Sequence, residues 1–392
     1  MTGLEERVRG LGARELEPVA EQAAGQAGRL LGWECQRLHF SKGGLGASEI
    51  YRFSGTLGGA EGPRPWSAVL RVLAANLGAR EFQARAILEP RREYDFYASG
   101  LAGGFPAGLR APRCYAQAPQ VGEDGTQEYW LWLEDLAPWQ VTEWSLAAYR
   151  RVAYVLGEMQ GAFALRPALP SANWMETALI RKYLGVTEPS FQQLFALRGQ
   201  PLVQRGGFST AVVDSLAELW ARREQHLALL ERLPQTFCQG DANPTNLFLS
   251  PGPPGQASVA AIDWASCGIG PLGQDLAQLF LTALNRFDPA YTRALDQTLS
   301  AGYLAGLRAA GWPGDARLAR LGYTAAMLKN RASYVLWWLP RLIDPASQER
   351  AARLFAARGL SYEAGLDQVA WIHAYLGELF AESLALRVEL KV

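Results

Sequence analysis

The sequence predicts an α+β protein of two lobes, a smaller N-terminal lobe that contains β-strands and a larger, mostly helical C-terminal lobe. The chain has 392 residues, whereas a single hydrophobic core stops growing at roughly 250–300 residues. Strand-like apolar segments dominate the part before residue 135, and apolar residues recur at helical spacing after residue 140. We therefore expect the lobes to span residues 1–135 and 136–392.

The composition indicates a globular protein and excludes several kinds of partner. Hydrophobic residues make up 49% of the chain, and Lys plus Arg equals Asp plus Glu at 38 each. The chain therefore has enough apolar surface for a core but lacks the cationic field that attracts nucleic acid. The four cysteines have no C-x-x-C spacing, which argues against zinc and disulfides and favours a cytoplasmic setting. We expect no secretory signal and no membrane span, and the oligomeric state stays open.

The N-terminal lobe is expected to begin with a helix and to continue in strands. Residues 15–32 carry apolar side chains at three- and four-residue steps, as in an amphipathic helix. The expected strands cover residues 39–41, 49–53, 68–73 and 129–133. A glycine-rich turn at 42–47 joins the first two strands into a hairpin. Proline is favoured at the first position of a helix, so Pro90 predicts the start of a helix that carries Glu93.

After residue 140 the pattern is helical, with one exception. Apolar residues along one face between Leu146 and Phe163 indicate the first helix. Further helices are expected at about 211–232, 272–285, 291–310, 316–339 and 361–388. Only residues 246–263 are rich in strand formers, which predicts an antiparallel hairpin within the helical lobe.

This hairpin and the loop before it carry three oxygen-bearing side chains. Asp241 and Asn246 lie five residues apart in a loop of turn-forming residues, and the hairpin returns Asp263 to the neighbourhood of Asn246. Amide and carboxylate oxygens suit Mg²⁺, so Asn246 and Asp263 are expected to be metal ligands. Asp241 is then left to orient an incoming hydroxyl and to accept its proton during phosphoryl transfer. Asp and Asn also serve simply as turn residues, which is the structural alternative.

These residues resemble the aminoglycoside phosphotransferase-like kinases, relatives of the protein kinases that phosphorylate antibiotics, sugars, choline and other small hydroxyl compounds. The H-G-D motif of the family, followed after four residues by N, matches Gly240, Asp241 and Asn246. The family motifs I-D-W and D-L-A match residues 262–264 and 275–277, and the resemblance spans most of the chain. It implies a bilobal protein-kinase-like fold, ATP and Mg²⁺ as cofactors, and transfer of the γ-phosphate to a hydroxyl of a small molecule.

The resemblance also implies a nucleotide site in the N-terminal lobe. Its residues are Gly43, Gly44, Ser48, Arg71, Glu93, Glu134, Asp135 and Leu136. The two glycines and the serine would cover the phosphates, and Arg71 would contact them. Glu93 would pair with Arg71, although Glu89 is a rival partner and Arg92 an alternative neighbour for Glu93. Backbone groups of residues 134–136 would form the hinge that binds the adenine edge.

Two departures from the family pattern leave an alternative open. Gln239 and Gln160 stand where the family usually has histidines, and glutamine can also donate and accept hydrogen bonds. Arg71 replaces the usual lysine, but its fork can grip phosphate oxygens. If these changes weakened turnover, the chain would be a nucleotide-binding pseudokinase. The acceptor stays open between a sugar, an amino alcohol, an aminoglycoside and a natural product, as does the choice between ATP and GTP.

Several conspicuous residues are expected to have structural or ordinary roles. Asp275 starts a predicted helix, where a carboxylate can cap exposed amides. Trp264 and the pair Trp337 and Trp338 are expected to pack in the core rather than to line a substrate pocket. The histidines are expected to be ordinary polar residues, and they are His39, His226 and His373.

Overall fold

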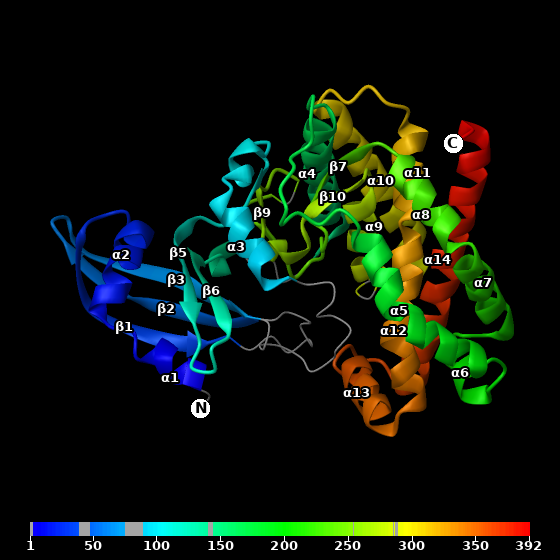
Figure 1. The fold of residues 1–392 in the computed structure, drawn as a ribbon, viewed down its shortest axis with the longest axis horizontal. Helices are drawn as coiled ribbons and strands as arrows, with labels where there is room; N and C mark the ends of the chain where they lie inside the picture. The colour runs from blue at the N-terminus through cyan, green and yellow to red at the C-terminus, as the bar shows by residue number, and fades with distance from the viewer. Residues whose placement is uncertain are drawn as a thin grey trace. The chain divides into compact units, whose positions relative to one another are not determined.

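The computed structural model describes residues 3–38, 48–74, 89–139, 144–253, 255–284, 286 and 289–392. The chain divides into two compact units. The first consists of Met1–Glu143 and Asn246–Ser266, and the second of Trp144–Thr245 and Cys267–Val392. Strands predominate in the first unit and helices in the second (Figure 1). The predicted α+β class is therefore confirmed.

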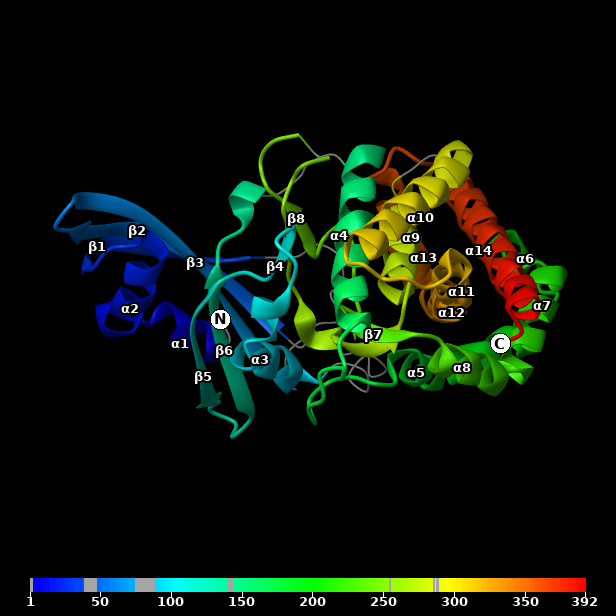
Figure 2. The same cartoon turned by 90° about the horizontal axis from the view of Figure 1, so that it is seen from above.

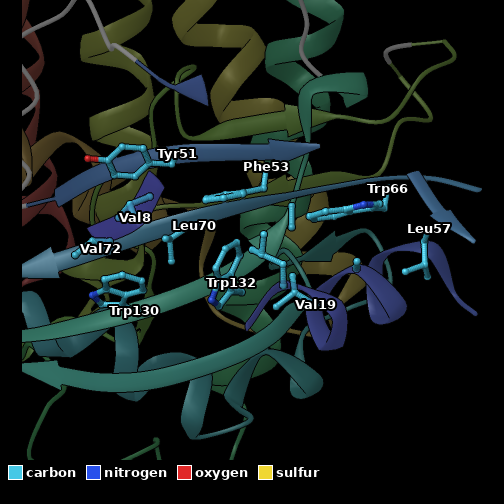
Figure 3. Close-up of a cluster of buried hydrophobic side chains, with 13 residues drawn as sticks. Val8, Val19, Tyr51, Phe53, Leu57, Trp66, Leu70, Val72, Trp130 and Trp132 are labelled. Carbon is cyan, nitrogen blue, oxygen red and sulfur yellow. The ribbon is translucent and has the colours of Figure 1, made fainter. Parts of the chain in front are cut away.

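The first unit contains an antiparallel sheet of five strands in the order β1-β2-β3-β6-β5. Its strands are β1 (Gly28–Arg37), β2 (Ser48–Gly59), β3 (Gly62–Ala74), β5 (Cys114–Val121) and β6 (Gln127–Glu134). Helices α1 (Gly3–Arg9) and α2 (Ala13–Ala24) contribute Val8 and Val19 to one buried cluster with the sheet (Figure 3). Within this cluster, Phe53 and Trp132 make an edge contact with ring centroids 5.1 Å apart. This burial supplies the core of the first unit.

A second, smaller sheet and one helix complete the first unit. Helix α3 (Pro90–Ala98) begins at the predicted proline. The sheet has the order β4-β9-β8, formed by β4 (Leu109–Arg110), β9 (Val259–Ala261) and β8 (Leu247–Leu249). Strands β8 and β9 are antiparallel, which confirms the predicted hairpin. Trp264 stacks on Phe96 of α3 with centroids 4.3 Å apart and donates its indole N–H to the Ala261 carbonyl at 2.8 Å, so it packs in the core as expected.

The second unit is mostly helical. Its helices are α4 (Leu146–Ala164), α5 (Leu179–Ala196), α6 (Pro201–Arg205), α7 (Thr210–Ala221), α8 (Arg223–Arg232), α9 (Gln274–Leu284), α10 (Thr292–Ala309), α11 (Ala316–Ala325), α12 (Met327–Ile343), α13 (Pro345–Ala356) and α14 (Tyr362–Leu390). Strands β7 (Gln235–Cys238) and β10 (Gly268–Pro271) pair antiparallel. Among the described residues, no helix combines the length and apolar character needed to cross a membrane.

Helices α4 and α10 lie side by side (Figure 2) because glycines let their backbones approach closely. A Cβ at Gly306 of α10 would lie 1.9 Å from the Tyr154 carbonyl oxygen of α4. Conversely, a Cβ at Gly157 of α4 would lie 2.2 Å from the Tyr303 carbonyl oxygen of α10. Any larger residue at either position would force the two helices apart.

The structure corrects several expected elements. The helix expected over 15–32 ends at Ala24, because Gly25 takes a left-handed backbone with φ of 70° and β1 follows from Gly28. The helix expected at 211–232 is divided at Arg222, and the helix expected at 316–339 is divided at Ala326. The elements that were not expected are β1, β4, β5, β7, β10, α1, α5, α6 and α13. The strand expected at 39–41 and the glycine-rich turn lie outside the described residues.

The two histidines that the structure describes were expected to be ordinary polar residues, and this expectation is wrong. His226 is 6% exposed and His373 is 1% exposed. His226 packs edge-on against Phe380, and the ring of His373 lies 4.4 Å from that of Phe208. Both residues follow the apolar spacing of a helix, and they belong to buried faces.

Candidate active site

The β8–β9 hairpin brings Asn246 and Asp263 to the end of the hairpin remote from its turn. Leu247 pairs with Ala261, and the Ile262 amide donates to the Asn246 carbonyl at 2.9 Å. Asn246 is 7% exposed, whereas the Asp263 side chain is 31% exposed. Asp263 takes a left-handed backbone with φ of 58°, which is uncommon for a residue other than glycine. Asp263 thus lies between the end of β9 at Ala261 and the short helical turn of Trp264–Ser266.

These two side chains fit a metal ion that is shared with a bound phosphate. Carboxylate and amide oxygens are the ligands that Mg²⁺ prefers, and Mg²⁺ usually keeps several water or phosphate oxygens as well. In the part of the chain that the structure describes, no group of three or more His, Cys, Asp or Glu residues is suited to hold a metal.

Arg71, near the C-terminal end of β3, forms ion pairs with two carboxylates of the first unit. Its Nε lies 3.1 Å from Glu93 Oε2 of α3, and its Nη2 donates to Asp263 Oδ1 at 2.8 Å. Burial opposes the charged guanidinium, but Asp263 and Glu93 outweigh this effect and raise the pKa of Arg71. Burial raises the pKa of Glu93 despite its cationic neighbour. The expected pair is thus present, whereas the rival Glu89 is exposed and lies 3.7 Å from Arg92.

Arg92 has a structural role that the sequence did not indicate. It is 3% exposed, and its Nη1 donates to the Ala265 carbonyl at 2.6 Å. This bond joins α3 to the segment that directly follows Asp263. The helix that carries Glu93 is therefore linked to the segment around Asp263 by Arg92 as well as by Arg71.

The residues expected to cover the phosphates are described only in part. Gly43 and Gly44 lie outside the described residues. Ser48 is the first residue of β2 and pairs with Leu73, while Ile50 pairs with Arg71. Residues two apart on a strand, and directly paired residues on neighbouring strands, share one face of a sheet. Ser48 and Arg71 therefore lie on the same face of the five-stranded sheet.

The segment expected to form the hinge has its acidic side chains engaged within the first unit. Glu134 accepts hydrogen bonds from both Nη atoms of Arg110, the longer at 2.9 Å. Asp135 accepts from the Ser67 hydroxyl at 3.0 Å and forms an ion pair with Arg52 at 2.8 Å. The carboxylates of Glu134 and Asp135 are therefore both engaged by neighbouring side chains.

Asp241 follows β7 in the second unit, and its loop is held by Asp275. The Asp275 carboxylate accepts from the backbone amides of Gln239 at 2.8 Å and Gly240 at 2.9 Å. The Gln160 side chain donates to the same carboxylate at 2.9 Å. Burial raises the pKa of Asp275, and the two amides oppose this shift. Asp275 is structural as expected, and its partners include the loop amides.

Gln239 fixes the backbone of Asp241 directly. Its Oε1 accepts the Asp241 amide at 2.7 Å, which is a typical local side-chain bond to the backbone two residues on. Gln160 in turn accepts the Tyr303 hydroxyl and donates to Asp275. The two glutamines that replace the family histidines are therefore both part of the support of this loop.

Three residues around Asp241 were not expected from the sequence. Gln278 Nε2 donates to Asp241 Oδ1 at 2.9 Å, and Lys329 Nζ donates to Gln278 Oε1 at 3.1 Å. The Lys329 ammonium lies 4.6 Å from the centre of the Tyr183 ring. Gln278 directly follows the D-L-A motif, and Lys329 lies in α12 among further polar residues that are also buried. No pattern in the sequence therefore singled out Lys329.

Comparison with known proteins gives a family and a fold. The model of the phosphotransferase enzyme family matches residues 83–321. No curated protein sequence matches the chain. Among solved structures, the chain is similar to the microcompartment-associated aminopropanol kinase with 13% identity and a TM-score of 0.54, covering 90% of this chain and 93% of that chain.

Two other solved structures give the same result. An amicoumacin kinase in complex with AMP-PNP, Ca²⁺ and Ami has 13% identity and a TM-score of 0.51, covering 94% of this chain and 96% of that chain. The GDP complex of wild-type aminoglycoside 2'-phosphotransferase-IIIa has 13% identity and a TM-score of 0.51, covering 96% and 99%. These likenesses confirm the predicted kinase-like fold.

Proposed function

Because the chain belongs to the phosphotransferase enzyme family, we propose that it transfers the γ-phosphoryl group of ATP to a hydroxyl of a small molecule. The observation that carries the proposal is the buried network of Arg71, Glu93 and Asp263. It places a permanent cation beside a half-exposed carboxylate on a rigid sheet. Such an arrangement suits a triphosphate with its metal, because little covalent chemistry is needed beyond positioning and charge neutralisation.

In this proposal the N-terminal lobe, residues 1–135, binds the nucleotide. Arg71 contacts phosphate oxygens, and Glu93 keeps its guanidinium in place. Ser48, together with Gly43 and Gly44, covers the phosphates. The backbone of residues 134–136 binds the adenine edge. Asn246 and Asp263 hold Mg²⁺, which when bound neutralises charge on the phosphates.

The base of the reaction is Asp241, in the C-terminal lobe of residues 136–392. Its carboxylate accepts the proton of the acceptor hydroxyl as the phosphoryl group is transferred. Asp275 and Gln239 hold the loop backbone, and Gln278 binds one carboxylate oxygen. The carboxylate is thus oriented before an acceptor arrives, which reduces the entropy that the reaction must lose.

The test compares the unaltered chain with Asp241→Asn. Labelled ATP and Mg²⁺ are supplied with a panel of sugars, amino alcohols, aminoglycosides and other natural products. The unaltered chain is expected to form product only with Mg²⁺ and an acceptor. The variant is expected to lose about 10²–10⁴-fold in turnover, the usual contribution of a general base, while ATP with Mg²⁺ still raises its melting temperature.

Each outcome of this experiment separates two possibilities. Unchanged turnover in Asp241→Asn contradicts the role of Asp241. A nucleotide-dependent rise in melting temperature without product from any acceptor supports a pseudokinase instead. Absence of any such rise contradicts nucleotide binding itself.

A further inference from the structure

We propose that Gln278 and Lys329 form a relay that positions the Asp241 carboxylate, and that both are positioning residues for phosphoryl transfer. The inference rests on the proposed function, because it concerns the proposed base. All members of the relay lie in the second unit. Gln278 comes from α9 and Lys329 from α12.

The polarity of the two bonds explains why the relay has one direction. A side-chain amide has a donor end and an acceptor end, whereas an ammonium only donates and a carboxylate only accepts. Gln278 donates to Asp241 Oδ1 at 2.9 Å and accepts from Lys329 Nζ at 3.1 Å. A reversed amide would set oxygen against the carboxylate and N–H groups against the ammonium. Lys329 therefore determines which end of Gln278 faces the base.

The surroundings of Lys329 make a purely structural role costly. Its side chain is 4% exposed, and burial lowers its pKa, although Asp241 and Asp275 oppose the shift. In the described part of the chain, no carboxylate forms an ion pair with it. The Tyr183 ring, 4.6 Å away, offers only a cation–π contact. An apolar side chain of similar length would fill this place without the cost of removing an ammonium from water.

The relay extends beyond the part of the chain that identifies the family. The family model ends at residue 321, whereas Lys329 lies in the helix that follows. Asp241 and Gln278 lie inside the matched region. Asp241, which lies in the matched region, is thus linked through Gln278 to a cation that lies beyond that region.

The relay predicts how the charge on Asp241 depends on pH. Three packed helices bring groups toward Asp241, namely Gln278 of α9, Lys329 of α12 and Tyr183 of α5. A nearby positive charge and a donated hydrogen bond both favour the ionised carboxylate. Loss of either should make Asp241 easier to protonate, so the acid limb of the activity profile should move to higher pH.

The experiment measures kcat, the KM for ATP and the pH profile of three variants, Lys329→Met, Gln278→Leu and the double variant. We expect kcat to fall about tenfold or more in each single variant, as for loss of a bond to a charged group, with the KM for ATP nearly unchanged. The double variant should fall no further, because the two residues act as a unit. Lys329→Arg should restore part of the activity. Lys391→Met, the same substitution at an exposed lysine, is the matched control.

The relay is overturned if the unaltered chain is active and every variant has the same kcat and the same acid limb of the pH profile as the unaltered chain. Independent, multiplying losses in the double variant would also overturn it. If Lys329→Met does not fold, Gln278→Glu removes the donor while keeping the side-chain shape, and unchanged kinetics there overturn the relay equally. Failure of the unaltered chain to transfer phosphate counts against the proposed function instead, so the two failures are distinguishable.

Discussion

The two units stabilise their buried cations in opposite ways. In the first unit, Arg71 lies between Glu93 and Asp263, and these carboxylates raise its pKa despite complete burial. In the second unit, burial lowers the pKa of Lys329 and lowers that of Arg331 to about 10. Among the described residues, neither of these two forms an ion pair. Their partners are an amide oxygen, a hydroxyl and aromatic rings.

This difference indicates two different uses of a buried charge. An ion pair fixes a guanidinium in one place, which suits a group that meets phosphate. Dipoles and aromatic rings offset less of the cost of removing a charge from water than a carboxylate does, so the pKa of such a cation depends more strongly on its neighbours. Loss of a carboxylate partner of Arg71 should therefore lower the free energy of unfolding more than loss of the buried cation in the second unit.

The largest expected effect is that of Glu93→Ala. It leaves Arg71 buried with one carboxylate instead of two, and breaking a buried pair costs about 3–5 kcal/mol. Urea unfolding of the variant measures this loss of free energy. Arg198→Ala, which breaks the exposed pair with Asp214, is the control and should change little. Equal losses in both variants would contradict the importance of burial.

A smaller effect, which is a gain in stability at acidic pH, is expected for His373→Phe. Burial, together with Arg331, lowers the pKa of His373 to about 3. The unfolded imidazole, with an ordinary value of about 6.5, takes up a proton first as the pH falls, so stability decreases below about 6.5. At pH 5 this contribution is about 2 kcal/mol.

Phenylalanine fits the aromatic surroundings of His373 and does not titrate. Relative to the unaltered chain, the variant should therefore gain about 2 kcal/mol between pH 7.5 and pH 5. Unfolding curves at the two pH values measure this gain. A difference that is the same at both would show that the imidazole is not held neutral.

Arg71→Lys tests whether both arms of the guanidinium matter. Lysine keeps the charge but is a single point donor, so it cannot reproduce the separate contacts of Nε with Glu93 and Nη2 with Asp263. We expect a loss of about 1.5 kcal/mol, the lower end of the range for one hydrogen bond to a charged group. Denaturant unfolding measures it, and an increase in stability would mean that the fork is not needed.

The smallest expected effect is that of Lys329→Met on stability, in contrast to its effect on turnover. Methionine has a similar length and needs no water, so the free energy of unfolding should change by less than about 1 kcal/mol. The same unfolding experiment measures it. A loss as large as that of Glu93→Ala would show that Lys329 stabilises the fold as strongly as the ion pair of Arg71 does.

The parts of the candidate site that depend on local sequence were predictable. Strand formers on both sides of the proline- and glycine-rich turn at 250–255 predicted the hairpin that sets Asp263 beside Asn246. Pro90 marked the start of α3. By contrast, the bond between Arg71 and Asp263 joins residues 192 apart, and only the family resemblance pointed to Arg71. Apolar periodicity found the helix of Lys329 but did not show which loop its polar residue faces.

The missed elements have similar physical reasons. Leu16 to Leu30 continue one helical spacing, so the pattern hides the change to strand after Gly25. Pro189 lies inside α5 and weakens the helical signal there. Strands β7 and β10 have four residues each and are buried for most of their length, too short to show an alternation.

The division of the chain between the two units has a consequence for biosynthesis. Residues 246–266 belong to the first unit, although the segments on both sides belong to the second. A ribosome must therefore complete residues 144–245 before β9, the partner of β4, has been made. Until then Arg71 lacks Asp263, and a fragment that ends at residue 143 cannot complete its own unit. The proposed metal ligands are thus encoded inside the unit that holds the proposed base, and neither half can be separated from the other by a single cut in the gene.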